Sequence, residues 1–168
     1  MSEFSALWQL AAKSLQAESQ ERVEAERRAC SVAFQIKALA AHLDQWVRAL
    51  NQAGPSGAEV ALLEQRPSEI HMLGVGWSER INSLDLDITI GAKTLYIRLK
   101  DFAFGDDVVA EVNGPLRCYE LRLSDTWGVY RQRSDVPEGL YDLEGPAPLD
   151  QTTFVELATS LFEDPNWR

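Results

Sequence analysis

The chain has 168 residues, of which 45% are hydrophobic and 25% charged, a composition typical of a soluble globular protein rather than a disordered one. Its formal net charge is −10, which disfavours binding to nucleic-acid phosphates and to anionic lipids. There is no apolar run of about 18 residues, and the first 20 residues lack the basic start and apolar stretch of a secretory signal. We therefore expect a cytoplasmic protein that binds neither nucleic acid nor membrane.

The charge is distributed unevenly along the chain. Residues 1–50 contain six bases and six acids, which leaves 10 of the 16 bases and 20 of the 26 acids in residues 51–168. The second part therefore carries the whole net charge. Such a surface attracts a basic partner protein, although an acidic surface also serves solubility alone, and both explanations remain open.

The first 50 residues predict a long helix. Apolar side chains recur at alternating spacings of four and three from Phe4 to Leu50, and only two of the 14 positions, Glu18 and Arg22, are polar. This is the heptad pattern of a coiled coil, and we call these 14 positions the seam. No proline interrupts the segment and no glycine occurs before Gly54, which with the proline after it predicts the helix end.

A helix of this length would measure about 70 Å, whereas a compact domain of this size is about 30–40 Å across. We therefore expect the helix either to protrude or to fold back as a helical hairpin near residues 16–22. The apolar stripe is wide in residues 29–50, which is typical of packing on the chain's own core. It is narrower in residues 3–25, where Trp8 and Leu15 are candidate contacts with a second copy in a homodimer. A two-helix hairpin within one core is the alternative.

After residue 55 the apolar period changes to two, which predicts strands. We expect an antiparallel sheet of about six strands in meander order, with a turn at Arg66-Pro67-Ser68 and a hairpin turn at Asn113-Gly114. Residues 134–149 predict a long loop, and Asp150 or Thr153 caps a C-terminal helix. The predicted fold class is α+β with the helices covering one face of the sheet, divided into a helical segment, 1–53, and an acidic α+β domain, 56–168.

Motifs for chemistry are lacking. The two histidines, His42 and His71, have no cysteine or carboxylate at a metal-ligand spacing. No complete glycine-rich phosphate loop occurs. Cys30 and Cys118 fall in a helix and a strand, where we expect buried, reduced thiols. We therefore predict no catalytic residue, no cofactor and no metal.

The candidate residues for contact with a partner protein are acidic or aromatic. The acids are of interest because a basic partner would pair with them, and tryptophan is frequent in the contacts that contribute most to binding. Asp85 and Asp87 share one face of a predicted strand, and neutralisation by Arg98 and Lys100 on the next strand is the competing explanation for them. Besides Trp8 and Leu15, the candidates are Trp77, Asp85, Asp87, Asp106, Asp107 and Trp127.

These features favour a non-catalytic protein-interaction module such as an adaptor, chaperone, inhibitor or immunity-type protein. It would self-associate through the N-terminal helix and present an acidic surface to a basic partner protein. The alternative is a small-molecule-binding or enzymatic domain, with carboxylates such as Asp101, Asp106 and Glu111 at the mouth of a pocket between sheet and helix. Mimicry of nucleic acid by the acidic half is a third hypothesis.

Overall fold

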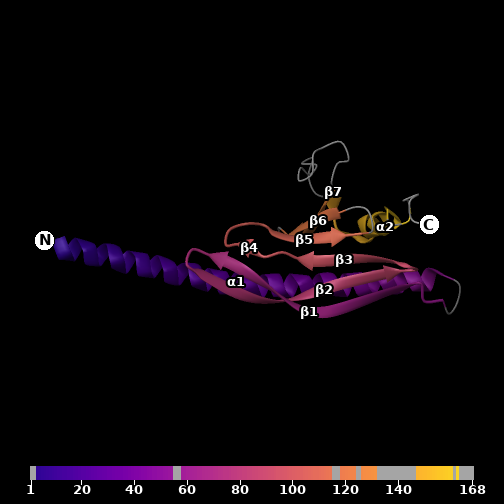
Figure 1. Ribbon diagram of the computed structural model, residues 1–168, viewed down its shortest axis with the longest axis horizontal. Coiled ribbons are helices and arrows are strands. Elements are labelled where there is room, and N and C mark those ends of the chain that lie inside the picture. The colour runs from indigo at the N-terminus through magenta and orange to yellow at the C-terminus, as the bar shows by residue number, and fades with distance from the viewer. Residues whose placement is uncertain are drawn as a thin grey trace.

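The computed structural model shows an α+β fold in which a long N-terminal helix lies along a mostly antiparallel sheet, with a short C-terminal helix at one end (Figure 1). The structure describes residues 3–54, 58–114, 118–123, 126–131, 147–160 and 162. Within them the elements are α1 (Glu3–Ala53), β1 (Ala61–Gly74), β2 (Trp77–Ile90), β3 (Lys93–Leu99), β4 (Phe102–Ala103), β5 (Val108–Asn113), β6 (Cys118–Leu123), β7 (Trp127–Arg131), β8 (Ala147–Pro148) and α2 (Gln151–Ser160).

Helix α1 is continuous and extends well beyond the sheet at its N-terminal end (Figure 1). Its sequence explains the continuity, because good helix formers fill it and glycine and proline are absent. The helical hairpin considered above therefore does not form. At the other end Asn51 joins the helix to β1: its side-chain amide donates to the Ala61 carbonyl at 2.8 Å, and its oxygen accepts from the backbone N–H groups of Val60 and Ala61 at 2.9 Å.

Six longer strands follow each other in the sheet in meander order, as predicted, and two-residue strands extend both edges. The order is β4-β1-β2-β3-β5-β6-β7-β8, and only β4 pairs in parallel, against the end of β1. The predicted turn at Arg66-Pro67-Ser68 is wrong, because β1 runs through it. Proline is tolerated there since β4 pairs only with Met72 and Leu73, so the outer side of Pro67 needs no N–H group.

The second corrected turn lies between β5 and β6. A two-residue turn at Asn113-Gly114 would pair Val112 with Pro115. The observed register instead pairs Val112 with Tyr119 and Asn113 with Cys118, so four residues separate the ends of the two strands. Of the predicted loop, residues 134–146 lie outside the described residues. Its last residues form β8, whose Ala147 pairs with Val129 of β7.

The β1–β2 hairpin twists as it follows α1 (Figure 1). Each residue of β1 pairs with one residue of β2 over the whole length, so the hairpin contains no bulge. The buried residues of β1 nevertheless change from an odd-numbered position, Ala61, to the even-numbered positions Ile70 and Met72. The buried positions of β2 change in the same way, from Ile81 to Leu86. A long two-stranded ribbon twists strongly, so it turns opposite faces toward the interior at its two ends. This twist carries the hairpin tip along α1 to the N-terminal end of the body.

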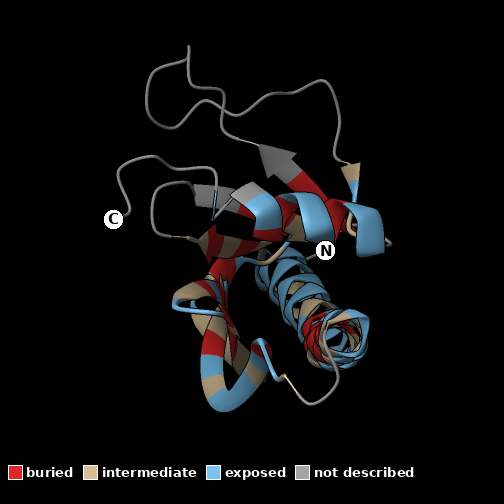
Figure 2. Ribbon diagram, turned by 90° about the vertical axis from the view of Figure 1, so that its right-hand side faces the viewer, coloured by how far each residue is buried: buried red, intermediate tan, exposed pale blue. Residues whose placement is uncertain are grey.

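One hydrophobic core joins the second half of α1 to the sheet. The buried face of α1 begins at Ala25 and ends at Val47, and its side chains pack with those of the strands and α2. In Figure 2 the buried residues lie where α1, the strands and α2 face one another, while the rest of α1 is exposed. We call the described residues from Ala25 onward the body and residues 4–24 the arm.

Helix α2 closes the core beside the C-terminal end of α1, where the rings of Trp46 and Phe154 lie 5.4 Å apart. Asp150 rather than Thr153 is its N-cap, since the Asp150 carboxylate accepts from the Thr153 backbone N–H at 2.8 Å. That hydrogen bond to the charged form lowers the pKa of Asp150 below its ordinary value of 3.8.

The prediction of a buried thiol at Cys30 is wrong. Cys30 is exposed, because it lies one position beyond Ala29 on α1 and so points away from the buried face. The side chain of Cys118 lies outside the described residues. Cys30 therefore offers a reactive group on the surface of α1, close to where the arm leaves the body.

Candidate functional site

The arm carries large apolar side chains that no described residue of the chain covers. Phe4 is 82% exposed, Trp8 72% and Leu15 67%. Leu7 and Leu10 are also exposed and widen the stripe on one side of the seam. Single exposed leucines are normal on protein surfaces, whereas a contiguous exposed group of this size with two aromatic rings is a feature typical of interaction sites. We call residues 4–15 the tip.

A polar segment separates the tip from the body. Residues 16–24, which we call the stalk, have the sequence QAESQERVE and contain the two polar positions of the seam, Glu18 and Arg22. Their side chains form an exposed ion pair at 3.4 Å, one helical turn apart. A surface pair of this kind contributes about 0.3–0.5 kcal/mol. The apolar surface of the tip is therefore a patch of its own and not the fringe of the core.

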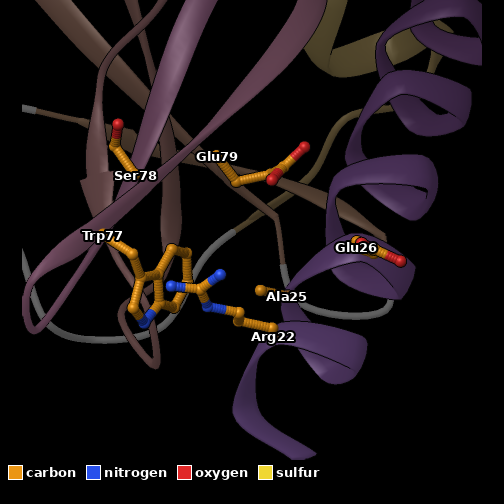
Figure 3. Close-up of a pocket in the computed structure, with 6 residues that line it drawn as sticks. All are labelled: Arg22, Ala25, Glu26, Trp77, Ser78 and Glu79. Atoms are coloured by element: carbon orange, nitrogen blue, oxygen red, sulfur yellow. The ribbon is translucent and has the colours of Figure 1, made fainter. Parts of the chain in front are cut away.

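A pocket of about 340 Å³ lies where the arm meets the body, between α1 and the tip of the β1–β2 hairpin (Figure 3). In Figure 3 Arg22 projects from α1 toward Trp77, and Glu79 projects from β2 toward α1. Trp77 also packs edge-on against Phe104, with the ring centroids 5.7 Å apart, and its indole N–H is buried with no hydrogen-bond partner. The lining residues are Arg22, Ala25, Glu26, Trp77, Ser78 and Glu79.

Arg28 anchors the neighbouring turn between β4 and β5 to α1. Its guanidinium donates to the backbone carbonyl of Asp106 and lies 5.3 Å from the centre of the Phe102 ring. Asp106 and Asp107 are exposed in this turn. They therefore remain available to a partner, on the same end of the body as the arm.

The other candidate acids, Asp85 and Asp87, belong to an ion-pair network on the sheet. Asp87 is only 6% exposed and accepts from both Arg66 and Arg98, while Asp85 lies 3.3 Å from Arg98. The neutralisation of this pair by Arg98 is thus observed. Lys100, which was expected to join it, instead pairs with acids of β5 and β6. Paired and partly buried carboxylates contribute little to a free acidic surface.

The remaining candidate, Trp127, is buried. Its indole N–H donates to the Gln35 carbonyl of α1 at 3.4 Å, so the side chain packs the sheet against the helix. The structure therefore brings Trp77, Asp106 and Asp107 to the base of the arm, places Trp8 and Leu15 on the tip, and keeps Trp127 inside. These residues do not form one surface, and each assignment to partner binding stays a prediction.

Sequence reasoning missed several residues of this region. Leu7 and Leu10 lie outside the seam positions. Glu26 and Glu79 line the pocket between α1 and the hairpin tip, and they do so only because of where the hairpin tip meets α1. The run of apolar residues beside the seam was a usable signal for the two leucines. No sequence signal places the hairpin tip along the helix.

A second pocket, of about 310 Å³, is apolar and lies between the C-terminal half of α1 and α2. Its walls include Trp46, Leu50, Phe154 and Phe162. Among the described residues no group of three or more His, Cys, Asp or Glu side chains is placed to hold a metal ion. In the same part of the chain no helix is both long enough and apolar enough to cross a membrane.

The chain matches no protein-family model, no curated protein and no solved structure at the level of similarity that indicates relatedness.

Proposed function

We propose that this protein is a non-catalytic interaction module that self-associates through the tip of its N-terminal helix and presents an acidic surface to a basic partner protein. One observation carries the proposal: the continuous helix α1 holds Phe4, Trp8 and Leu15 in water, outside the body. Keeping such side chains exposed costs about 1.5–3 kcal/mol each relative to burial. A surface that covers them therefore gains that free energy.

The acidic part of the proposal rests on the distribution of charge. Residues 51–168 carry the net charge of −10, and their exposed acids include Asp106 and Asp107 beside the base of the arm, whose carboxylates form no ion pair among the described residues. A basic partner would meet these carboxylates without first breaking the ion pairs of Asp85 and Asp87. This is why we place the contact at the β4–β5 turn.

The enzymatic alternative has weaker support. Its three carboxylates line neither of the two pockets described above: Asp101 accepts from the His71 backbone N–H at 2.7 Å, Glu111 pairs with Lys100, and Asp106 lies in an exposed turn. The pocket between α1 and β2 is lined by other acids, Glu26 and Glu79, together with Arg22.

Self-association is tested by light scattering coupled to size-exclusion chromatography over a range of concentrations. We expect a concentration-dependent dimer that Leu15→Asp abolishes, because a charge would be buried in the contact. Gln9→Asp is the matched control, since Gln9 is exposed on the tip, lies off the seam and gains the same charge. A wild-type protein that stays monomeric at high concentration refutes self-association.

The acidic contact is tested by cross-linking and capture from the host with two double variants. Asp106→Asn with Asp107→Asn should lose a basic protein that the wild type captures at low salt. Glu59→Gln with Glu64→Gln removes the same charge from exposed positions elsewhere and should retain it. Equal loss in both variants would show that net charge alone attracts the protein and would count against a contact at the turn.

A further inference from the structure

We infer that two copies pair tip to tip in antiparallel orientation, with Phe4 of one opposite Leu15 of the other and Trp8 opposite Ala11. The inference rests on the self-association proposed above and names its partner, a second copy of this chain, and its geometry. It follows from the position of the sheet, from the charges on the arm and body, and from the spacing of the seam.

The sheet leaves room for an antiparallel partner only. The seam keeps one register from the tip into the body, where the same face of α1 is covered from Ala25 onward. A parallel partner helix would have to continue along that face and would collide with the β1–β2 hairpin, whose tip lies beside Arg22 and Ala25. An antiparallel partner passes its own N-terminus along the arm and ends before the hairpin, so both bodies stay clear.

Charge favours the same orientation. Parallel pairing in register would place Glu18 opposite Glu18 of the second copy and Arg22 opposite Arg22, and like charges facing one another destabilise a pair of helices. It would also set the two acidic parts, each with a net charge of −10, side by side. Antiparallel pairing avoids both repulsions by placing the bodies at opposite ends.

The seam permits only a few antiparallel registers. The seam consists of two alternating series, one with Phe4, Ala11 and Glu18 and the other with Trp8, Leu15 and Arg22. In an antiparallel pair of helices, a residue of one series faces a residue of the other series on the second copy, and we call each such facing pair a layer. The register therefore shifts in steps of seven residues.

Comparison of these registers selects one. A shift that lengthens the overlap by seven residues would place Phe4 on Arg22 and Trp8 on Glu18, burying charged groups against aromatic rings. A further step would require Phe4 to reach Ala29, which the chain's own sheet covers. The proposed register has four layers, all of them apolar. Phe4 faces a leucine, and the larger Trp8 faces a small alanine, so the side-chain volumes of each layer complement one another.

The available area suits a modest dimer. An aromatic side chain offers about 150–250 Å², and Phe4 and Trp8 are 82% and 72% exposed. With the tip leucines, each arm can bury about 500–600 Å², or about 1,000–1,200 Å² in total, which is the lower end for a specific interface. We therefore expect an equilibrium between monomer and dimer that depends on protein concentration.

The geometry fixes a distance that a native residue can report. The dimer axis would pass between residues 9 and 10, so Cys30 lies about 31 Å from it along the helix, at 1.5 Å per residue. The two Cys30 residues would be about 60 Å apart in this register and about 50 Å apart in the longer one. In a parallel dimer they would lie at one level, within about 30 Å even with the label arms.

The test is double electron–electron resonance on spin labels at Cys30, which is exposed, in a chain carrying Cys118→Ser. Circular dichroism confirms folding, and Cys118→Ala replaces the serine variant if that one does not fold. A distance near 60 Å, lost in Leu15→Asp and kept in Gln9→Asp, supports the inference. A dimer with a distance near 50 Å or below 30 Å overturns the geometry while leaving self-association intact, whereas a monomer refutes both.

A disulfide test uses the seam itself, in chains carrying Cys30→Ser and Cys118→Ser. Chains with Phe4→Cys and chains with Leu15→Cys should form a disulfide when mixed with oxidised glutathione as the oxidant, because facing residues of a layer bring their Cβ atoms within reach of a bridge. Neither variant should cross-link efficiently alone. Efficient cross-linking of Leu15→Cys chains to each other would indicate parallel pairing.

Discussion

Substitution by alanine at two leucines in equivalent positions of the same heptad pattern should have opposite effects: one variant should lose stability and the other should lose self-association. Leu15 and Leu43 are separated by four heptads, yet Leu15 is 67% exposed and Leu43 is 1% exposed. Leu43→Ala removes contacts from the closed core between α1 and the sheet, and such a change costs about 2–5 kcal/mol. Leu15→Ala in the monomer removes no core contact and should stay within about 0.5 kcal/mol of the wild type.

Urea unfolding of dilute protein measures the difference. With a slope of about 2 kcal/mol per molar urea, Leu43→Ala should lower the midpoint by about 1–2.5 M and Leu15→Ala by less than about 0.3 M. Light scattering at high concentration should give the reverse order, since Leu15→Ala weakens the dimer and Leu43→Ala leaves the tip unchanged. A large loss of stability in dilute Leu15→Ala would show that the arm packs on its own body, and the separation of arm and body would then be wrong.

Three further outcomes follow from single contacts. Gly74→Ala should lower the melting temperature and shift the fluorescence of Trp77, because a Cβ at Gly74 would overlap the indole ring; unchanged melting would mean that the hairpin end readily shifts. Asp150→Asn should be less stable than the wild type at neutral pH. The difference should disappear as pH falls through the lowered pKa of Asp150, since a depressed carboxyl pKa stabilises the fold only while the carboxyl group is ionised. A difference in the free energy of unfolding that stays constant as the pH is lowered would contradict this. One alanine inserted between Gln20 and Glu21 turns the tip by about 100° relative to the body but should leave the dimer intact, as judged by light scattering, because only tips touch; loss of the dimer would place part of the contact on the body.

The secondary structure was largely predictable because its periods are clear. The seam indicates α1 from end to end, and the alternation in residues such as Leu86, Ile88 and Ile90 indicates a strand with one buried face. Strand β1 was misread at Pro67 because proline is ordinarily a strand breaker, and only the absence of β4 along that part of the edge makes it acceptable. Whether an edge is covered is a property of the sheet, which a local pattern does not contain.

The candidate site was less predictable for a related reason. Trp127 and Asp87 have the residue types of binding surfaces, but tertiary contacts with Gln35 and with two arginines place them inside. Conversely Leu7 and Leu10 are ordinary helix residues. They are candidates for a contact only because the covered part of α1 begins at Ala25, which leaves both side chains exposed. Burial depends on which distant segments meet, so composition and spacing alone do not assign it.

The polar layers of the seam explain how one uninterrupted heptad pattern can serve two different partners. From Ala25 onward the apolar face of α1 is covered by the chain's own sheet, whereas from Phe4 to Leu15 none of the described residues covers the same face. Were Glu18 and Arg22 apolar, a partner helix could slide toward the body by seven residues at no cost in buried charge. With a charged pair at these positions, sliding requires taking both groups out of water, a cost of several kcal/mol per ion. In the dimer that we propose, the stalk would therefore limit pairing to the tip, and the body would keep its core whether or not a second copy is bound.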